Sequence, residues 1–177
     1  MASSFVIADP RKCVGCKACM AACLVKHFVP GDVPAARLNV VKVGENMTAP
    51  ILCHHCEAAP CAASCPTGAL YRDGDRVAVK LSQCIGCRSC VVACPFGAVT
   101  VVERYNAAQL GDITVGAGSR AMVVKCDRCV DRKNGPACIE ACTSNALQLM
   151  SQETLDSRIA ARRAEAADEA ADIASVL

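Results

Sequence analysis

The fold is decided by residues 84–95. They read Cys84-Ile85-Gly86-Cys87-Arg88-Ser89-Cys90-Val91-Val92-Ala93-Cys94-Pro95, which is the spacing C-x2-C-x2-C-x3-C-P. Such short gaps bring three thiolates onto three irons of one [4Fe–4S] cluster, while the fourth thiolate reaches a second cluster. Gly86 suits so tight a loop because glycine accepts positive φ and brings no Cβ toward the cluster. This stretch therefore predicts an iron–sulfur ligand loop.

Three further cysteine quartets repeat or widen this spacing. They are Cys13, Cys16, Cys19 and Cys23; Cys53, Cys56, Cys61 and Cys65; and Cys126, Cys129, Cys138 and Cys142. The first has the same gaps as residues 84–94, and the other two have wider middle gaps. All sixteen cysteines of the chain fall into the four quartets. We therefore predict four [4Fe–4S] clusters, with every cysteine a metal ligand.

Disulfides and zinc are the alternatives for so many cysteines. A disulfide framework belongs to secreted proteins, but the N-terminal sequence has no basic region followed by a long apolar run, so we expect no signal peptide. Zinc also binds paired C-x2-C units, yet four ligands complete its site and leave a third closely spaced cysteine unexplained. The spacing favours iron–sulfur clusters over both.

Composition supports a cluster-filled interior. The 177 residues include three Phe, two Tyr and no Trp, so a core of side chains alone would be thin. The formal net charge of +2 would become about −6 once four clusters of about −2 each are bound. We therefore expect no nucleic-acid binding. No apolar stretch reaches the length of a membrane span, and we expect a cytoplasmic protein.

The expected elements point to an α+β fold of tandem bacterial-type, two-cluster ferredoxin-like modules with short β-hairpins. Strands are expected at residues 5–8, 37–43 and 96–101, a hairpin at 70–80 and an exposed loop at 109–120. The repeat of Cys-Pro-x-Gly-Ala at 65–69 and 94–98 indicates internal duplication. Residues 50–101 would form an inner module, and residues 1–49 with 102–150 an outer module.

Residues 151–177 differ in composition and predict a C-terminal helical tail. They are rich in Ala, Arg and Glu and contain neither Gly nor Pro. Apolar side chains recur along one stripe at Leu155, Ile159, Ala166, Ala170, Ile173 and Leu177. The helix could pack on its own domain, dock a partner or a second copy, or fray.

The chain resembles the four-cluster electron-transfer subunits of formate dehydrogenase and formate hydrogenlyase, a group related to the β subunits of molybdopterin oxidoreductases. The residues that carry the resemblance are Phe5-Val6-Ile7-Ala8-Asp9 before Cys13-Val14-Gly15-Cys16; Cys53-His54-His55-Cys56-Glu57-Ala58-Ala59-Pro60-Cys61; Cys94-Pro95-Phe96-Gly97-Ala98; Lys125-Cys126-Asp127-Arg128-Cys129; and Gly135-Pro136-Ala137-Cys138. It covers residues 5 to about 150. One departure is Thr143, which stands after Cys142 where the family often has Pro.

This resemblance implies that the last cysteine of each quartet serves a partner quartet. Cys53, Cys56 and Cys61 would take Cys94, while Cys84, Cys87 and Cys90 would take Cys65. Cys13, Cys16 and Cys19 would take Cys142, while Cys126, Cys129 and Cys138 would take Cys23. The four clusters would then form a wire.

Several residues beside the ligands need an interpretation. His54 and His55 are expected to form hydrogen bonds or to be exposed, because their cysteine quartet is already complete. Basic residues beside the ligands would be either solvated surface groups or charges that offset the clusters. These are Lys12, Lys17, Arg88, Lys125 and Arg128. The sequence contains no catalytic triad, phosphate loop or nucleotide fingerprint, so we expect no enzyme activity.

The implied function is electron transfer. The chain would pass single electrons between a molybdenum or tungsten formate dehydrogenase subunit and a hydrogenase or other acceptor. One alternative is a wire that links carbon monoxide dehydrogenase to a hydrogenase. Another, from a different class, is a structural or redox-sensing scaffold.

Overall fold

Two small cysteine-rich cores organise the chain. The computed structural model describes residues 4–29, 33–45, 47–110 and 112–174. One core comprises Ala59, Cys61, Ala69, Leu70, Val77, Cys84, Cys90, Val99 and Val123. The other comprises Val6, Cys19, Cys23, Leu38, Leu52, Cys138 and Leu147. Within the described residues neither core contains an aromatic side chain, in agreement with an interior built around cysteines.

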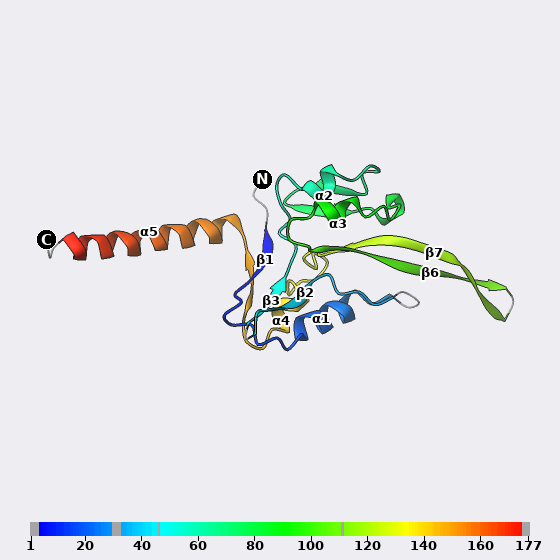
Figure 1. Cartoon of the computed structure of the whole chain (residues 1–177), viewed down its shortest axis with the longest axis horizontal. Helices are drawn as coiled ribbons and strands as arrows, with labels where there is room; N and C mark the ends of the chain where they lie inside the picture. The colour runs from blue at the N-terminus through cyan, green and yellow to red at the C-terminus, as the bar shows by residue number, and fades with distance from the viewer. Residues whose placement is uncertain (1–3, 30–32, 46, 111, 175–177) are drawn as a thin grey trace.

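One half of the fold is built from both ends of the cysteine-bearing part of the chain. Strand β1 (Phe5–Ala8) pairs antiparallel with β8 (Leu147–Met150), and β2 (Asn39–Val43) pairs with β3 (Met47–Ile51). Helix α1 (Ala18–Lys26) packs against the short helix α4 (Ala137–Glu140) (Figure 1). The first and fourth quartets are therefore neighbours. The expected strand at 37–43 begins two residues later than predicted.

The second half brings the middle two quartets together. Helix α2 (Pro60–Ala63) packs against α3 (Ser89–Ala93), with the 3-10 turn η1 (Leu81–Gln83) before α3. The predicted hairpin is confirmed as β4 (Leu70–Asp73) and β5 (Arg76–Val79). The predicted α+β ferredoxin-like class is confirmed. The module boundaries at residues 50 and 101 stay a prediction, which the separation into two cores supports.

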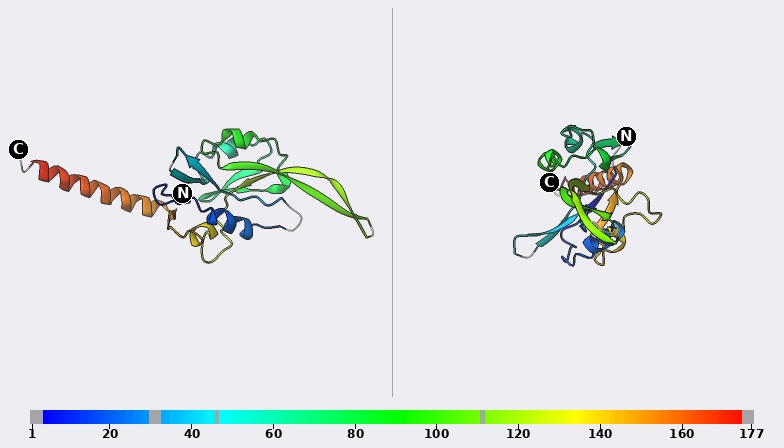
Figure 2. Two further views of the ribbon diagram at one scale, coloured as in Figure 1. Left: turned by 60° about the horizontal axis from the view of Figure 1, so that its bottom comes forward. Right: turned by 90° about the vertical axis from the view of Figure 1, so that its right-hand side faces the viewer.

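A long β-hairpin corrects two expectations. Strand β6 (Val99–Leu110) pairs with β7 (Ile113–Lys125) in a register that places Val99 opposite Lys125. The predicted strand end at 101 and the loop at 109–120 are therefore wrong. Cross-strand pairing along the hairpin outweighs the weak strand preference of glycine in this stretch. The hairpin extends from the rest of the fold, opposite in direction to the C-terminal helix (Figures 1 and 2).

The predicted C-terminal helix is confirmed as α5 (Gln152–Ala174). Ser151 caps its first turn, because the Thr154 N–H donates a 3.2 Å hydrogen bond to the Ser151 hydroxyl. Every residue of α5 except Thr154 is exposed, and the helix points away from both cores (Figure 1). The alternative that it packs on its own domain is therefore wrong. Leu177 of the predicted stripe lies outside the described residues.

The described part of the chain offers no helix long and apolar enough to cross a membrane.

Candidate iron–sulfur cluster sites

The four cysteine loops share one backbone feature. In each leading C-x2-C segment, the residue before the second cysteine has positive φ: +71° at Gly15, +46° at His55, +69° at Gly86 and +63° at Arg128. This conformation curls the loop so that successive thiols face the same interior point. Glycine adopts it freely, whereas His55 and Arg128 have to be held in it by their surroundings.

A second repeated feature follows the last cysteine of three quartets. The N–H groups of Gly68, Gly97 and Asn145 each donate to the carbonyl oxygen of the cysteine three residues earlier, at 3.2, 3.3 and 3.2 Å. All three have positive φ. Thr143 therefore leaves this turn intact, with Asn145 in the place of glycine.

Two small cavities are each bordered by cysteines of different quartets. One is lined by Cys65 together with Cys84, Cys87 and Cys90, which we call the Cys87 site. The other is lined by Cys142 together with Cys13, Cys16 and Cys19, which we call the Cys16 site. In both, the last cysteine of one quartet lies with the first three cysteines of another.

At the other two sites, cysteines of two quartets also lie close enough to affect one another's pKa. Burial first, and then the neighbouring thiols of Cys53 and Cys94, raise the pKa of Cys61 to about 11. We call Cys53, Cys56, Cys61 and Cys94 the Cys53 site. Burial first, and then Cys126, Cys23 and Cys129, raise the pKa of Cys138 to about 12. We call Cys126, Cys129, Cys138 and Cys23 the Cys126 site. Thiols with such pKa values hold their protons at neutral pH until iron displaces them.

The donor set fits [4Fe–4S] clusters better than zinc or disulfides. All sixteen cysteines are free thiols. Tetrahedral zinc with Zn–S of about 2.3 Å would place its sulfurs about 3.8 Å apart. Among the described residues, no three cysteine sulfurs lie within 4.8 Å of one another. The wider spacing leaves room for a cluster rather than a single ion.

Backbone N–H groups point at ligand sulfurs of several sites. The Arg37 N–H lies 3.3 Å from the Cys23 sulfur, and the Arg128 N–H lies 3.3 Å from the Cys126 sulfur. Those of Ala98 and Ala146 lie 3.4 and 3.2 Å from the sulfurs of Cys94 and Cys142. Hydrogen bonds to ligand sulfur are among the levers by which proteins set cluster potentials.

Sequence reasoning missed a polar pair at the Cys126 site. His27 Nε2 lies 3.7 Å from the Cys129 sulfur and 3.5 Å from an oxygen of Asp127. Asp127 also accepts hydrogen bonds from Arg37 and from the Cys129 N–H. The three ligand-type atoms of His27, Asp127 and Cys129 lie close enough to hold an ion. Because Cys129 already belongs to the Cys126 site, His27 and Asp127 are better placed to hold that ligand in position than to bind a separate ion.

A signal for His27 was present in the sequence. It lies four residues after Cys23, at the C-cap of α1, so the two residues share one face of that helix.

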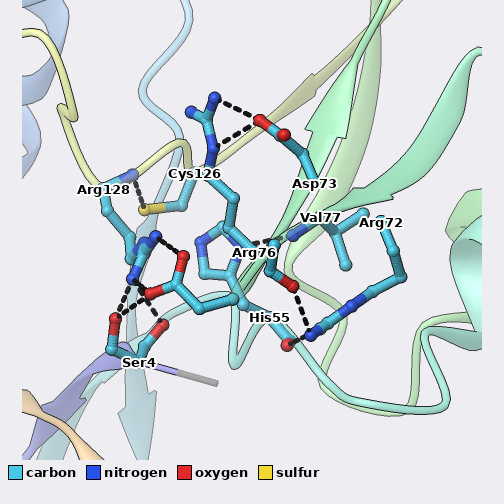
Figure 3. Close-up of polar contacts among 10 residues, drawn as sticks. Ser4, His55, Arg72, Asp73, Arg76, Val77, Cys126 and Arg128 are labelled. Carbon is cyan, nitrogen blue, oxygen red and sulfur yellow. Dashed lines mark hydrogen bonds and ion pairs between the residues drawn. The ribbon is translucent and has the colours of Figure 1, made fainter. Parts of the chain in front are cut away.

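His55 is anchored on the hairpin β4–β5. Its Nδ1 accepts the Val77 N–H at 3.1 Å, and its carbonyl oxygen accepts Arg72 at 2.9 Å (Figure 3). His55 is fully buried, and burial lowers its pKa to about 3. His54 stacks between Phe5 and Phe96, with ring centroids 5.0 and 3.9 Å away. The expected hydrogen-bonding role is confirmed for His55, and stacking explains His54.

Arg128 is held by a charged network. Its guanidinium donates to both oxygens of Asp75, at 2.6 and 2.7 Å, and to Ser4 (Figure 3). The Arg128 side chain is 10% exposed and Lys125 is 3% exposed. The solvated-surface reading is therefore wrong for these two residues. It is right for Lys12, Lys17 and Arg88, which are exposed.

Comparison with known proteins assigns the family. Residues 45–152 match the family model described as 4Fe-4S dicluster domain, and residues 12–70 match a second model of the same description. The chain belongs to the 4Fe–4S dicluster family. It is a ferredoxin-like iron–sulfur electron-transfer protein.

Three relatives from Escherichia coli K12 match over nearly their whole length. Electron transport protein HydN is 40% identical over 166 residues, covering 90% of this chain and 94% of HydN. Putative electron transport protein YsaA is 41% identical over 156 residues (84% and 90%). Formate hydrogenlyase subunit 2 is 36% identical over 184 residues (91% and 88%). The putative oxidoreductase AegA is 41% identical, but the chain spans only 24% of its length.

Proposed function

We propose that the chain is a non-catalytic subunit that relays single electrons through four [4Fe–4S] clusters, one at each of the four cysteine sites. A bound [4Fe–4S] cluster supplies one-electron chemistry. The chain's own residues would hold the thiolates, exclude water from them and set the surrounding charge. The exchange of last cysteines between quartets, and the two-module division at residues 50–101, are part of this proposal.

The order of the sites is the observation that carries the proposal. Cys138 and Cys23 share a core with Cys19, which makes the Cys126 site a neighbour of the Cys16 site. Lys125 donates to the carbonyl oxygens of both Cys126 and Val77, and Val77 donates to His55 between Cys53 and Cys56, which links the Cys126 and Cys53 sites. Cys61 shares a core with Cys84 and Cys90, which links the Cys53 and Cys87 sites. These contacts support a linear relay with the Cys16 and Cys87 sites at its ends.

Exposure distinguishes the ends from the middle. Cys16 and Cys87 are the exposed cysteines, whereas all four cysteines of the Cys126 site are buried. Val14, two residues before Cys16, is 69% exposed, and Ile85, two residues before Cys87, is 64% exposed. A redox partner that covered either apolar side chain would come close to an end cluster. Two such ends suit a protein that takes electrons from one partner and passes them to another.

The names of the relatives suggest which partners these are. One of them is formate hydrogenlyase subunit 2, and a further relative from Escherichia coli K12, hydrogenase-4 component A, is 36% identical over 173 residues (85% of this chain and 84% of that protein). We therefore propose a molybdenum or tungsten formate dehydrogenase subunit at one end and a hydrogenase, or another acceptor, at the other. Helix α5, exposed along nearly its whole length, would dock one of these subunits or a second copy of the chain.

Anaerobic purification of the affinity-tagged chain from its native host tests this function. Mass spectrometry should identify a formate-oxidising subunit and a hydrogenase in the same complex. Carbon monoxide dehydrogenase in place of the formate-oxidising subunit would favour that alternative. A chain that purifies without redox enzymes, and shows no set of low-potential centres in a spectroelectrochemical titration, would favour a scaffold or sensor and contradict the proposal.

A further inference from the structure

Lys125 is a buried cation without a carboxylate partner. It ends β7 directly before Cys126 and is 3% exposed. Its ammonium donates to the carbonyl oxygens of Val77 at 2.6 Å and Cys126 at 2.7 Å. In the part of the chain that the structure describes, no ion pair includes Lys125. Burying an ammonium is unfavourable unless a negative charge compensates it. That charge has to come from another group.

The position of the Lys125 ammonium indicates which groups supply the compensating negative charge. Its Nζ lies 2.7 Å from the carbonyl oxygen of Cys126 and 2.6 Å from that of Val77. Val77 shares a core with Cys61 and donates its N–H to His55, which lies between Cys53 and Cys56. Cys61 belongs to the Cys53 site, and Cys126 belongs to the Cys126 site. Lys125 thus lies between the two middle sites.

The surrounding strands fix this position. Lys125 lies opposite Val99 in the β6–β7 register, so its backbone cannot shift alone. The backbone carbonyl oxygen of Val77 on β5 accepts a hydrogen bond from the Lys125 ammonium, and the Val77 N–H donates to His55 Nδ1. A lysine on a surface would extend its charge into water. Here the charge stays in the interior.

We propose that Lys125 is the shared counter-charge of the two middle cluster sites and raises the reduction potentials of both. This inference deepens the proposed relay and rests on it. Each oxidised cluster with its four thiolates carries about −2, and reduction adds one more negative charge. A fixed cation nearby favours the more negative state, the more so where water is excluded. The complete burial of the Cys126 site would otherwise oppose reduction. Lys125 offsets that effect, so that the middle of the relay accepts electrons from its ends.

The test is an EPR-monitored redox titration of the anaerobically prepared four-cluster protein. In Lys125→Met, a side chain of similar length without charge, two of the four potentials should fall. We expect at least a tenfold loss in the reduction equilibrium at each, which corresponds to about 59 mV for one electron. The other two potentials should stay in place. Lys125→Arg keeps the charge and should restore the two potentials.

Lys133→Met is the matched control. Lys133 lies between Cys129 and Cys138 in sequence but is exposed, so water screens its charge. It should leave all four potentials unchanged. Four unchanged potentials in Lys125→Met, an equal fall of all four, or an equal response in Lys133→Met would each overturn the inference.

Iron analysis of the same samples separates the possible failures. About sixteen iron per wild-type chain with unshifted potentials in Lys125→Met overturns the counter-charge and leaves the relay intact. If Lys125→Met loses iron, the iron content of Lys125→Arg distinguishes a required charge from a packing role. Full iron in the Arg variant supports a required charge, whereas iron loss in both variants indicates a packing role and overturns the inference.

Discussion

Gly86 lies against Ala121 on β7, so closely that a Cβ on Gly86 would stand 2.9 Å from the Ala121 carbonyl oxygen. The preceding residue in the strand, Arg120, donates to the carbonyl oxygens of Ser82 at 2.9 Å and Cys84 at 2.7 Å. The base of the long hairpin therefore covers the ligand loop of the Cys87 site. The loop needs glycine for its positive φ and for this close approach.

Gly86→Ala should therefore destabilise the Cys87 site. Strained φ and the clash with β7 together should cost about 3 kcal/mol, and about a quarter of the bound iron should be lost. Iron content and the anaerobic unfolding midpoint measure both effects. Gly74→Ala is the control, since Gly74 has φ of +59° but no neighbouring atom within 4 Å of an added Cβ. It should cost only about 1 kcal/mol of strain. Equal losses in the two variants would contradict the role of β7.

The exchange of last cysteines gives a second prediction. Cys94→Ser should perturb the EPR signal of the cluster at the Cys53 site, because Cys94 is proposed to complete that site. Cys65→Ser is the reciprocal variant and should perturb the signal of the Cys87 site. If each variant instead perturbs the cluster held by its own quartet, the exchange is wrong.

Much of this arrangement follows from local sequence. The quartets, the strand at 5–8, the hairpin at 70–80 and the terminal helix could all be predicted, because short-range spacing and turn chemistry determine them. The β6–β7 hairpin could not. Its stability comes from pairing between strands, and Gly116 and Gly118 in β7 favour a loop when read alone.

The environment of the ligands could be predicted only in part. The sequence identifies Lys125 and Arg128 as neighbours of Cys126, but not their burial, which depends on β5 and on Asp75. The positive φ of His55 could not be predicted either, because a hydrogen bond with Val77, which is far away in the sequence, holds the residue in place. Such features arise from packing between segments that are far apart in the chain.

Asp75 gives a prediction about pH. The hydrogen bond from Arg128 lowers the pKa of Asp75 to about 2, below the value of about 3.9 expected in the unfolded chain. The carboxylate therefore stabilises the fold above about pH 4, and this contribution is lost as the pH falls toward 2. Asp75→Asn should lower the free energy of unfolding at pH 7 by about 1 kcal/mol.

Asp73→Asn is the control for Asp75. The Asp73 side chain is 45% exposed and pairs with Arg76 within the same hairpin, whereas the 43% exposed Asp75 reaches a cysteine loop. Denaturant unfolding at pH 7 should show a smaller loss for Asp73→Asn. A loss in Asp75→Asn no greater than in Asp73→Asn would argue against the Arg128 network as a support for this loop.

The exposure of α5 predicts that it contributes little to the fold. Deletion of residues 153–177 should leave the iron content and the unfolding temperature within error of the intact chain, because α5 packs on neither core. Anaerobic size-exclusion chromatography with the co-purified subunits should show weaker assembly. Lost iron with unchanged assembly would mean that the helix supports its own domain.

The central claim is that this chain holds four [4Fe–4S] clusters, and metal analysis tests it most directly. Protein prepared anaerobically should contain about sixteen iron and about sixteen acid-labile sulfide per chain, with negligible zinc. About eight iron per chain, or zinc in stoichiometric amount, would contradict the four-cluster relay.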